Sequence, residues 1–256
     1  MGNNLGNEKM KEKRLLTTLF CAGALACALV MTSCGGGGGT EGGKTEAKFK
    51  KQPKNEFLGD LVNIAGEYEA KWDASEAEYK EARKKNNEKY ADNSDKREQN
   101  YGKISASHKE RGKQIVADAN AALEKEMATL NGKALPFVFE EGLGFEVVEC
   151  KITGITKHAS SCNRTTLTFT YKVRATDEDL VKKISVHDYP IKYGFVDANG
   201  NALLDKKGNA ITEIGGFSNE HLKQLRNGET VEKEGWFVLE PSFANFAKIK
   251  FERNRY

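Results

Sequence analysis

The chain has 256 residues, which is enough for one or two domains. Charged residues make up 30% of it and hydrophobic residues 38%, a soluble composition that is poorer in apolar residues than a typical globular chain. The formal net charge is only +3. Because nucleic-acid binding depends on a strong excess of positive charge, this near-neutral balance gives no reason to expect a nucleic-acid partner.

The N-terminus has the pattern of a signal peptide. A short basic patch at residues 11–14 precedes an apolar run at residues 15–31, and the small residues Thr-Ser-Cys follow at 32–34. A basic region, an apolar core and small residues at the junction are typical of a secretory signal. The apolar run is marginal for a membrane-spanning helix, which needs about 20 residues. We therefore predict that residues 1–33 form a signal peptide.

Residues 30–34, Val-Met-Thr-Ser-Cys, resemble the lipobox of bacterial lipoproteins. That family usually has an aliphatic residue such as leucine where this chain has Met31. The resemblance implies cleavage before Cys34, a diacylglyceryl group on its sulfur and acylation, for example with palmitate, of the new amine. Two or three acyl chains make a stable membrane anchor. The expected location is the cell envelope, at the periplasmic side of the outer membrane or at the cell surface. An ordinary secretory signal with a chance cysteine is the alternative.

Residues 34–56 are predicted to be a flexible tether rich in glycine and lysine. Two nucleotide-binding patterns match within it, G-x-x-x-x-G-K-T at 38–45 and G-x-G-x-x-G at 37–42. Both patterns bind phosphate only where a buried strand leads into the glycines and a helix leaves them. A signal peptide precedes these glycines and a lysine-rich coil follows, so we expect no nucleotide and no other cofactor.

Residues 57–132 are predicted to form a charged, coiled-coil-like helical arm, since they lack proline and are rich in alanine, glutamate, lysine and glutamine. The turn-like residues 91–95 suggest an antiparallel hairpin of helices 57–91 and 95–131. One long helix is the alternative, because aromatic residues recur every 11 positions across this turn and would share one helical face. These aromatic residues are Phe57, Tyr68, Tyr79, Tyr90 and Tyr101.

Residues 135–256 are predicted to form a β-sandwich. Residues 166–173 alternate strictly between polar and apolar side chains, as in a half-buried strand. Residues 145–156 read as an earlier strand whose alternation slips near 147–148, which indicates a bulge. Further strands are expected at 191–196, 236–239 and 246–251, and turns at 197–201 and 205–209.

The order of these pieces resembles the immunoglobulin-like extracellular domains found on many bacterial lipoproteins. The matching stretches are an alternating strand, an apolar strand that ends in Asp-x-x-Gly, a Gly-Glu turn and a late aromatic strand. They lie at 166–173, 193–200, 227–229 and 235–251, within residues 143–253. The resemblance implies an α+β chain whose second part is an immunoglobulin-like sandwich, and it carries no shared active site.

Cys150 and Cys162 are the only cysteines of the expected mature chain besides Cys34, and an oxidising compartment favours a disulfide between them. The strand register argues against it. A direct hairpin of 145–156 and 165–173 places Cys150 opposite Tyr171 and leaves Cys162 in the loop, beyond the roughly 7 Å that a disulfide spans between Cα atoms. Both outcomes remain open at this point.

Motifs of catalysis and metal binding are missing from the sequence. It has no H-E-x-x-H, no cysteine pair at zinc spacing and no G-x-S-x-G. The pairs that suggest acyl transfer, His158 with Ser160 or Ser161 and Ser218 with His221, each lie in one short loop. We therefore expect no enzyme, no metal and no catalytic residues.

Three classes of function remain. We expect a membrane-anchored, non-catalytic module that binds a protein or cell-wall partner. A small-ligand or glycan-binding lipoprotein is the alternative, and an enzyme with an unrecognised site is the third class. Four aromatic residues are candidates for lining a carbohydrate or peptide site, although core packing also explains them: Tyr189, Tyr193, Trp236 and Phe237.

Overall fold

The computed structural model describes residues 49–140, 142 and 144–254, and the structural statements that follow concern this part of the chain. The predicted signal peptide, Cys34 and most of the predicted tether lie outside it. The described residues belong to one compact unit. None of their helices combines the length and the apolar character that a membrane crossing requires.

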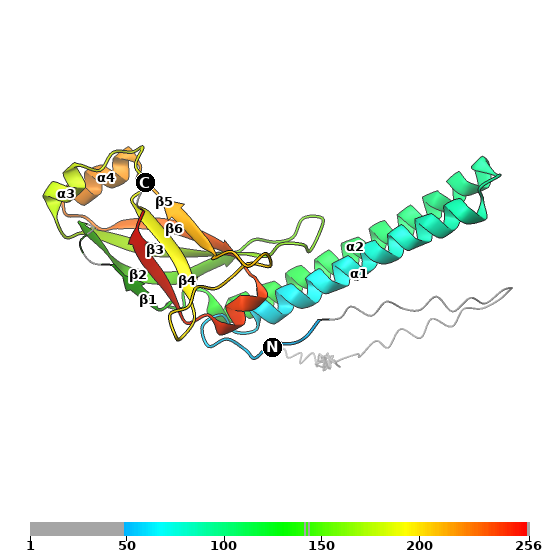
Figure 1. The fold of residues 1–256 in the computed structure, drawn as a ribbon, viewed down its shortest axis with the longest axis horizontal. Coiled ribbons are helices and arrows are strands. Elements are labelled where there is room, and N and C mark those ends of the chain that lie inside the picture. The colour runs from blue at the N-terminus through cyan, green and yellow to red at the C-terminus, as the bar shows by residue number, and fades with distance from the viewer. Residues whose placement is uncertain (1–48, 141, 143, 255–256) are drawn as a thin grey trace, which may run out of the picture. The chain divides into compact units, whose positions relative to one another are not determined.

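The fold is α+β, with two helices followed by a sandwich-like region of two sheets, as the sequence predicts at this level (Figure 1). The long helices are α1 (Leu61–Lys89) and α2 (Ser94–Leu130). The strands are β1 (Phe137–Phe139), β2 (Phe145–Ile155), β3 (Thr166–Ala175), β4 (Ile191–Val196), β5 (Thr212–Gly215), β6 (Val231–Val238) and β7 (Lys248–Arg253). The short helices are α3 (Glu178–Lys182), α4 (Asn219–Arg226) and the 3-10 helix η1 (Pro241–Asn245).

The seven strands form a three-stranded sheet in the order β2-β3-β6 and a four-stranded sheet in the order β1-β7-β4-β5. Every pairing is antiparallel except that of β1 with β7, which is parallel. The register of β2 shifts between Val147 and Glu149, which confirms the predicted bulge. Cys150 pairs with Tyr171, as the sequence register predicts.

The helices form an antiparallel hairpin, and the single long helix is not formed (Figure 1). The side chain of Asn93 accepts a hydrogen bond from the Lys96 N–H at 2.9 Å and so begins α2. The tyrosine period has a different cause from a continuous helix. The hydroxyls of Tyr79 on α1 and Tyr101 on α2 lie 3.2 Å apart, so these two members of the period meet across the hairpin from different helices.

The hydrophobic core is shared by the sandwich and the root of the hairpin. Apolar side chains at the start of α1 and the end of α2 belong to the same buried cluster as the inner faces of both sheets. The middle and tip of the hairpin bury chiefly polar or small residues, such as Ser75 and Asn86. The hairpin residues in the shared core are Leu61, Val62, Ala65, Leu123, Met127 and Leu130.

Cys150 and Cys162 are both buried and unbonded in the structure, which is the outcome that the strand register favours. Cys150 lies in the main core, whereas Cys162 packs with Val116 and Ala119 against the hairpin. The strand register explains why the two cysteines lie apart: Cys150 is in β2, whereas Cys162 is in the loop after β2, which leaves the sheet and docks on α2. Burial raises the pKa of both thiols, that of Cys162 to about 11.

Candidate functional site

The candidate site is a groove of about 490 Å³ at one end of the sandwich. Its lining comes from α3, from the segment between α3 and β4, from β5 and from the end of β7. We call it the α3–β5 groove. Its lining includes the apolar residues Leu180, Tyr189 and Ile214 and the polar residues Lys183, Asp188 and Arg253.

Exposed apolar side chains gather in this groove. The described chain has eight large hydrophobic residues that are exposed, and three of them line it. Leu180 is 36% exposed, Ile214 48% and Tyr189 54%. Such a concentration of apolar surface, bordered by polar groups, is typical of a binding site rather than of a solvated surface.

Local structure fixes the walls of the groove. The Asp177 side chain accepts hydrogen bonds from the N–H groups of Asp179 and Leu180, at 2.9 and 3.1 Å, and so begins α3. Tyr189 packs against the backbone of Gly216, where an added Cβ would lie 3.1 Å from its ring and 3.0 Å from the Asp188 carbonyl. The glycine therefore lets the β5 end of the groove approach the segment before β4.

The charged groups of the groove are unevenly matched. The Asp188 carboxylate accepts a hydrogen bond from the Ser185 N–H at 2.7 Å, so it is engaged within its own turn. Neither Lys183 nor the Arg253 guanidinium forms an ion pair with another described residue. The Glu140 carboxylate accepts from the Arg253 backbone N–H at 3.0 Å. The groove thus offers two cationic side chains and the Asp188 carboxylate beside its apolar wall.

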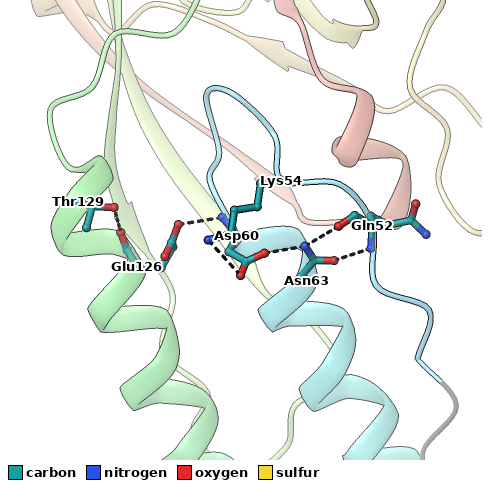
Figure 2. Close-up of polar contacts among 6 residues, drawn as sticks. All are labelled: Gln52, Lys54, Asp60, Asn63, Glu126 and Thr129. Carbon is teal, nitrogen blue, oxygen red and sulfur yellow. Dashed lines mark hydrogen bonds and ion pairs between the residues drawn. The ribbon is translucent and has the colours of Figure 1, made fainter.

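A network of hydrogen bonds lies where the predicted tether meets the hairpin (Figure 2). Residues 49–54, which we call the strap, run along the root of α1. The buried amide of Asn63 accepts from the Gln52 N–H at 2.8 Å and donates to the Gln52 carbonyl at 3.0 Å and to the Asp60 carboxylate at 2.6 Å. One side chain therefore holds both backbone groups of Gln52.

Further contacts hold the strap and the turn that follows it. The Phe49 ring occupies the space above Gly66, where any larger residue would collide with it. The Asn55 amide donates to the carbonyl of Phe246 at 2.7 Å. The Asp60 N–H donates to the Glu126 carboxylate at 2.8 Å, as Figure 2 shows. This end of the predicted flexible tether is instead fixed to both the hairpin and the sandwich.

In the hairpin, one histidine ring lies within hydrogen-bond distance of both a serine hydroxyl and a glutamate carboxylate. The His108 ring lies 3.4 Å from the Ser75 hydroxyl and 3.1 Å from the Glu76 carboxylate, and it stacks on Tyr79 with 4.3 Å between ring centroids. Ser75 is only 2% exposed. Because Ser75 lies on α1 and His108 on α2, these contacts join the two helices.

The two hydroxyl–imidazole pairs that the sequence singles out both serve local structure. Ser218 and His221 form a capping box at the start of α4, in which the Ser218 hydroxyl accepts from the His221 N–H at 3.1 Å. The His158 ring instead contacts the Thr165 hydroxyl at 3.2 Å. The His158 backbone exchanges two hydrogen bonds with the Asn120 amide, both 2.8 Å long, which docks its loop on α2.

The four candidate aromatic residues divide between core and surface. Tyr193 and Phe237 are buried, at 3% and 1% exposure, whereas Tyr189 and Trp236 are exposed. Only Tyr189 lines the α3–β5 groove. Sequence reasoning did not identify Leu180, Ile214, Lys183 or Arg253, because nothing in the local pattern brings these four segments together.

Comparison with known proteins gives no relative: no family model, no curated protein and no solved structure matches the chain. In the described part of the chain, no group of three or more histidine, cysteine, aspartate or glutamate side chains is arranged to hold a metal ion.

Proposed function

We propose that the chain is a lipid-anchored protein of the bacterial cell envelope that binds a partner through the α3–β5 groove and has no catalytic activity. The gathering of exposed Leu180, Tyr189 and Ile214 in one groove is the observation that carries the binding role. The lipobox-like residues at Cys34 support the anchor. The use of Ser218 and His221 in a helix cap supports the non-catalytic assignment.

Site-specific photocrosslinking in intact cells tests the binding role. A photoreactive amino acid replaces Tyr189, and in a matched control it replaces Leu204, which is 45% exposed but does not line the groove. We expect a discrete adduct from position 189 and none from position 204. The same adduct pattern from both positions, or none from either, would count against the groove.

Detergent-phase partitioning tests the anchor separately. The wild-type chain should enter the detergent phase, and Cys34→Ala should behave as a soluble protein. A Cys34→Ala chain that stays uncut and bound to the membrane would show that the apolar segment is a membrane helix. If metabolic labelling with a fatty acid marks the wild type and Cys34→Ala equally, the lipid is not on Cys34 and the anchor is assigned wrongly.

We also propose that the sandwich is immunoglobulin-like. The order β2-β3-β6 corresponds to strands A, B and E of that fold, and β5-β4-β7 corresponds to C′, C and F. β1 lies beside β7, in the place of strand G, but is parallel to it. The fold is consistent with a binding role, since loops at the ends of such sandwiches commonly carry function.

Glycan binding is the second candidate, and Trp236 is the residue that favours it. Its side chain is 39% exposed on β6, opposite Thr168, whose other neighbour in register is Gly154. An exposed indole ring beside a hydroxyl suits a sugar ring, which would share this surface with the Arg164 guanidinium, 5.7 Å from the ring centroid. In a Trp72→Phe background, peptidoglycan fragments should change the Trp236 fluorescence if this role holds. A flat titration would remove this candidate.

A further inference from the structure

The charge of the helical hairpin changes sign along its length. Residues 80–103 form the tip, which is the end of the hairpin far from the sandwich (Figure 1). The tip holds eight cations and five anions, a net charge of +3. Residues 61–79 and 104–130, the remainder of α1 and α2, hold five cations and nine anions, a net charge of −4. Positive charge is therefore concentrated at the free end of the hairpin.

Four lysines of the tip lie on one face of the hairpin. Glu78 on α1 and Lys103 on α2 line the same shallow groove of about 330 Å³ between the two helices. Lys85 lies two turns after Glu78 and Lys89 one turn further, so both continue this face of α1. Lys96 lies two turns before Lys103 on α2. We call Lys85, Lys89, Lys96 and Lys103 the lysine face.

The lysine face is exposed and almost unpaired. All four residues are exposed. Within the part of the chain that the structure describes, only Lys85 forms an ion pair, with Glu81 at 3.5 Å, and both of these side chains are more than half exposed. Such exposed pairs hold their partners weakly. The other acids of the tip lower its net charge without reversing it, and they are Glu88, Asp92, Asp95 and Glu98.

The strap directs the predicted tether toward this end of the hairpin. The Phe49 ring lies above Gly66, and the backbone of Gln52 is bonded to Asn63, so the strap runs antiparallel to α1 (Figure 2). Gly66 is nearer the tip than Asn63. The chain that precedes Phe49 therefore approaches the strap from the side of the tip.

The distances allow the lipid anchor and the lysine face to meet one surface. Phe49 lines a hollow of about 350 Å³ with Lys71, which lies two turns before Glu78 and so on the same side of α1 as the lysine face. Between the Phe49 contact and Lys89, α1 rises about 35 Å. The fifteen residue steps from Cys34 to Phe49 span about 50 Å when fully extended. A lipid on Cys34 can therefore reach as far as the tip and beyond it.

We propose that the lysine face binds the anionic lipid headgroups of the membrane to which Cys34 is anchored. Basic side chains close to such a surface are each attracted to it. The tether keeps the tip near the membrane, so a contact that is weak between separate molecules is sufficient. The contact orients the hairpin on the membrane. The inference rests on the proposed lipid anchor and adds a second membrane contact to it.

Energy transfer from a dye at the tip to a dye-labelled lipid tests the proposal. Residues 35–256 retain the whole compact unit that the structure describes, and a histidine tag before residue 35 attaches them to a nickel-chelating lipid. The donor dye is placed on Ala91→Cys in the exposed turn, since Cys150 and Cys162 are buried. The vesicles contain phosphatidylcholine alone or with about 30% phosphatidylglycerol, an anionic lipid, and we expect transfer to be at least about twofold more efficient on the anionic vesicles.

Lysine-to-glutamine variants provide the matched comparison. Transfer on anionic vesicles should fall to the value on neutral ones when the lysine face is replaced by Lys85→Gln, Lys89→Gln, Lys96→Gln and Lys103→Gln. The control makes the same change of net charge at exposed lysines away from the tip, with Lys109→Gln, Lys125→Gln, Lys207→Gln and Lys223→Gln. The control should keep the full difference between the vesicles. Both variants retain the lysines of the tether, and circular dichroism verifies their helix content.

The contrary results are distinct. Equal transfer of the wild type on the two kinds of vesicle overturns the proposal, and so does an equal loss in both variants, which would show attraction by net charge alone. High salt should remove the difference, because it screens the contact. Retention of the wild type on immobilised polyglutamate without any response to vesicles would assign the lysine face to an acidic protein and overturn the membrane contact. The histidine tag makes the result independent of Cys34, so the lipid anchor can fail separately in the labelling experiment.

Discussion

Replacing Asn63 with alanine should release the strap from the hairpin. The Asn63 side chain is 4% exposed and makes three hydrogen bonds, two to the backbone of Gln52 and one to the Asp60 carboxylate. A neutral hydrogen bond contributes about 1 kcal/mol net and one to a charged group about 1.5 kcal/mol or more. We therefore expect Asn63→Ala to lower the free energy of unfolding by about 3 kcal/mol.

Hydrogen exchange and urea unfolding together measure this effect. In the wild type the Gln52 amide should be protected from exchange, because its N–H is bonded to Asn63 at 2.8 Å. In Asn63→Ala that amide should exchange as an unfolded one does, while core amides such as that of Phe169 remain protected. Urea unfolding of both chains then gives the difference in free energy.

Gln52→Ala is the matched control. The hydrogen bonds between Asn63 and Gln52 involve only the backbone of Gln52. The Gln52 side chain makes one exposed hydrogen bond of 3.3 Å, to the Lys50 carbonyl. This substitution should change the free energy of unfolding by less than about 0.5 kcal/mol. The reasoning is refuted if Gln52→Ala costs as much as Asn63→Ala, or if the Gln52 amide keeps its protection without Asn63.

Three further outcomes are expected. Ser218→Ala removes the cap of α4 and should lower the free energy of unfolding by about 1 kcal/mol, measured by urea unfolding, whereas Ser218→Asp should retain most of it. Burial lowers the pKa of His158 and of His221 below the ordinary 6.5, so the unfolded chain takes up protons first and stability falls as the pH drops below about 6.5. His158→Gln should reduce that slope in unfolding curves measured between pH 5 and 8, and an unchanged slope would refute the assignment. Cys150 and Cys162 should both be alkylated in the denatured, unreduced chain and neither in the native one, as mass spectrometry would detect; a chain that resists alkylation until it is reduced would show a disulfide.

Strand patterning could be predicted from the sequence because it depends on near neighbours. The bulge at Val147 and the pairing of Cys150 with Tyr171 follow from alternation and from the length of the loop. The turn between the two helices could also be predicted, because residues 91–95 have a turn-like sequence. The 11-residue period was harder to interpret, since residues equally spaced along one helix can equally well meet across two, as Tyr79 and Tyr101 do.

The groove and the strap could not be predicted in the same way. The groove residues come from four segments, and Leu180 and Ile214 have no feature in the sequence that separates them from core residues. The strap depends on Asn63, a buried polar residue in a helix whose side chain is bonded to the backbone of Gln52. Gly66 is the one available signal, since a glycine inside a helix often marks a close approach, here by Phe49.

The core of the sandwich takes apolar residues only from the root of the hairpin, which makes the length of the hairpin beyond it an adjustable dimension. α2 has 37 residues and therefore extends over about 55 Å. Its residues in the shared core are Leu123, Met127 and Leu130, all in its last turns. Insertions or deletions that keep the two helices in phase near the tip would leave these contacts intact. Related chains could thus differ in span while keeping the same sandwich, with the hairpin serving as a spacer of variable length.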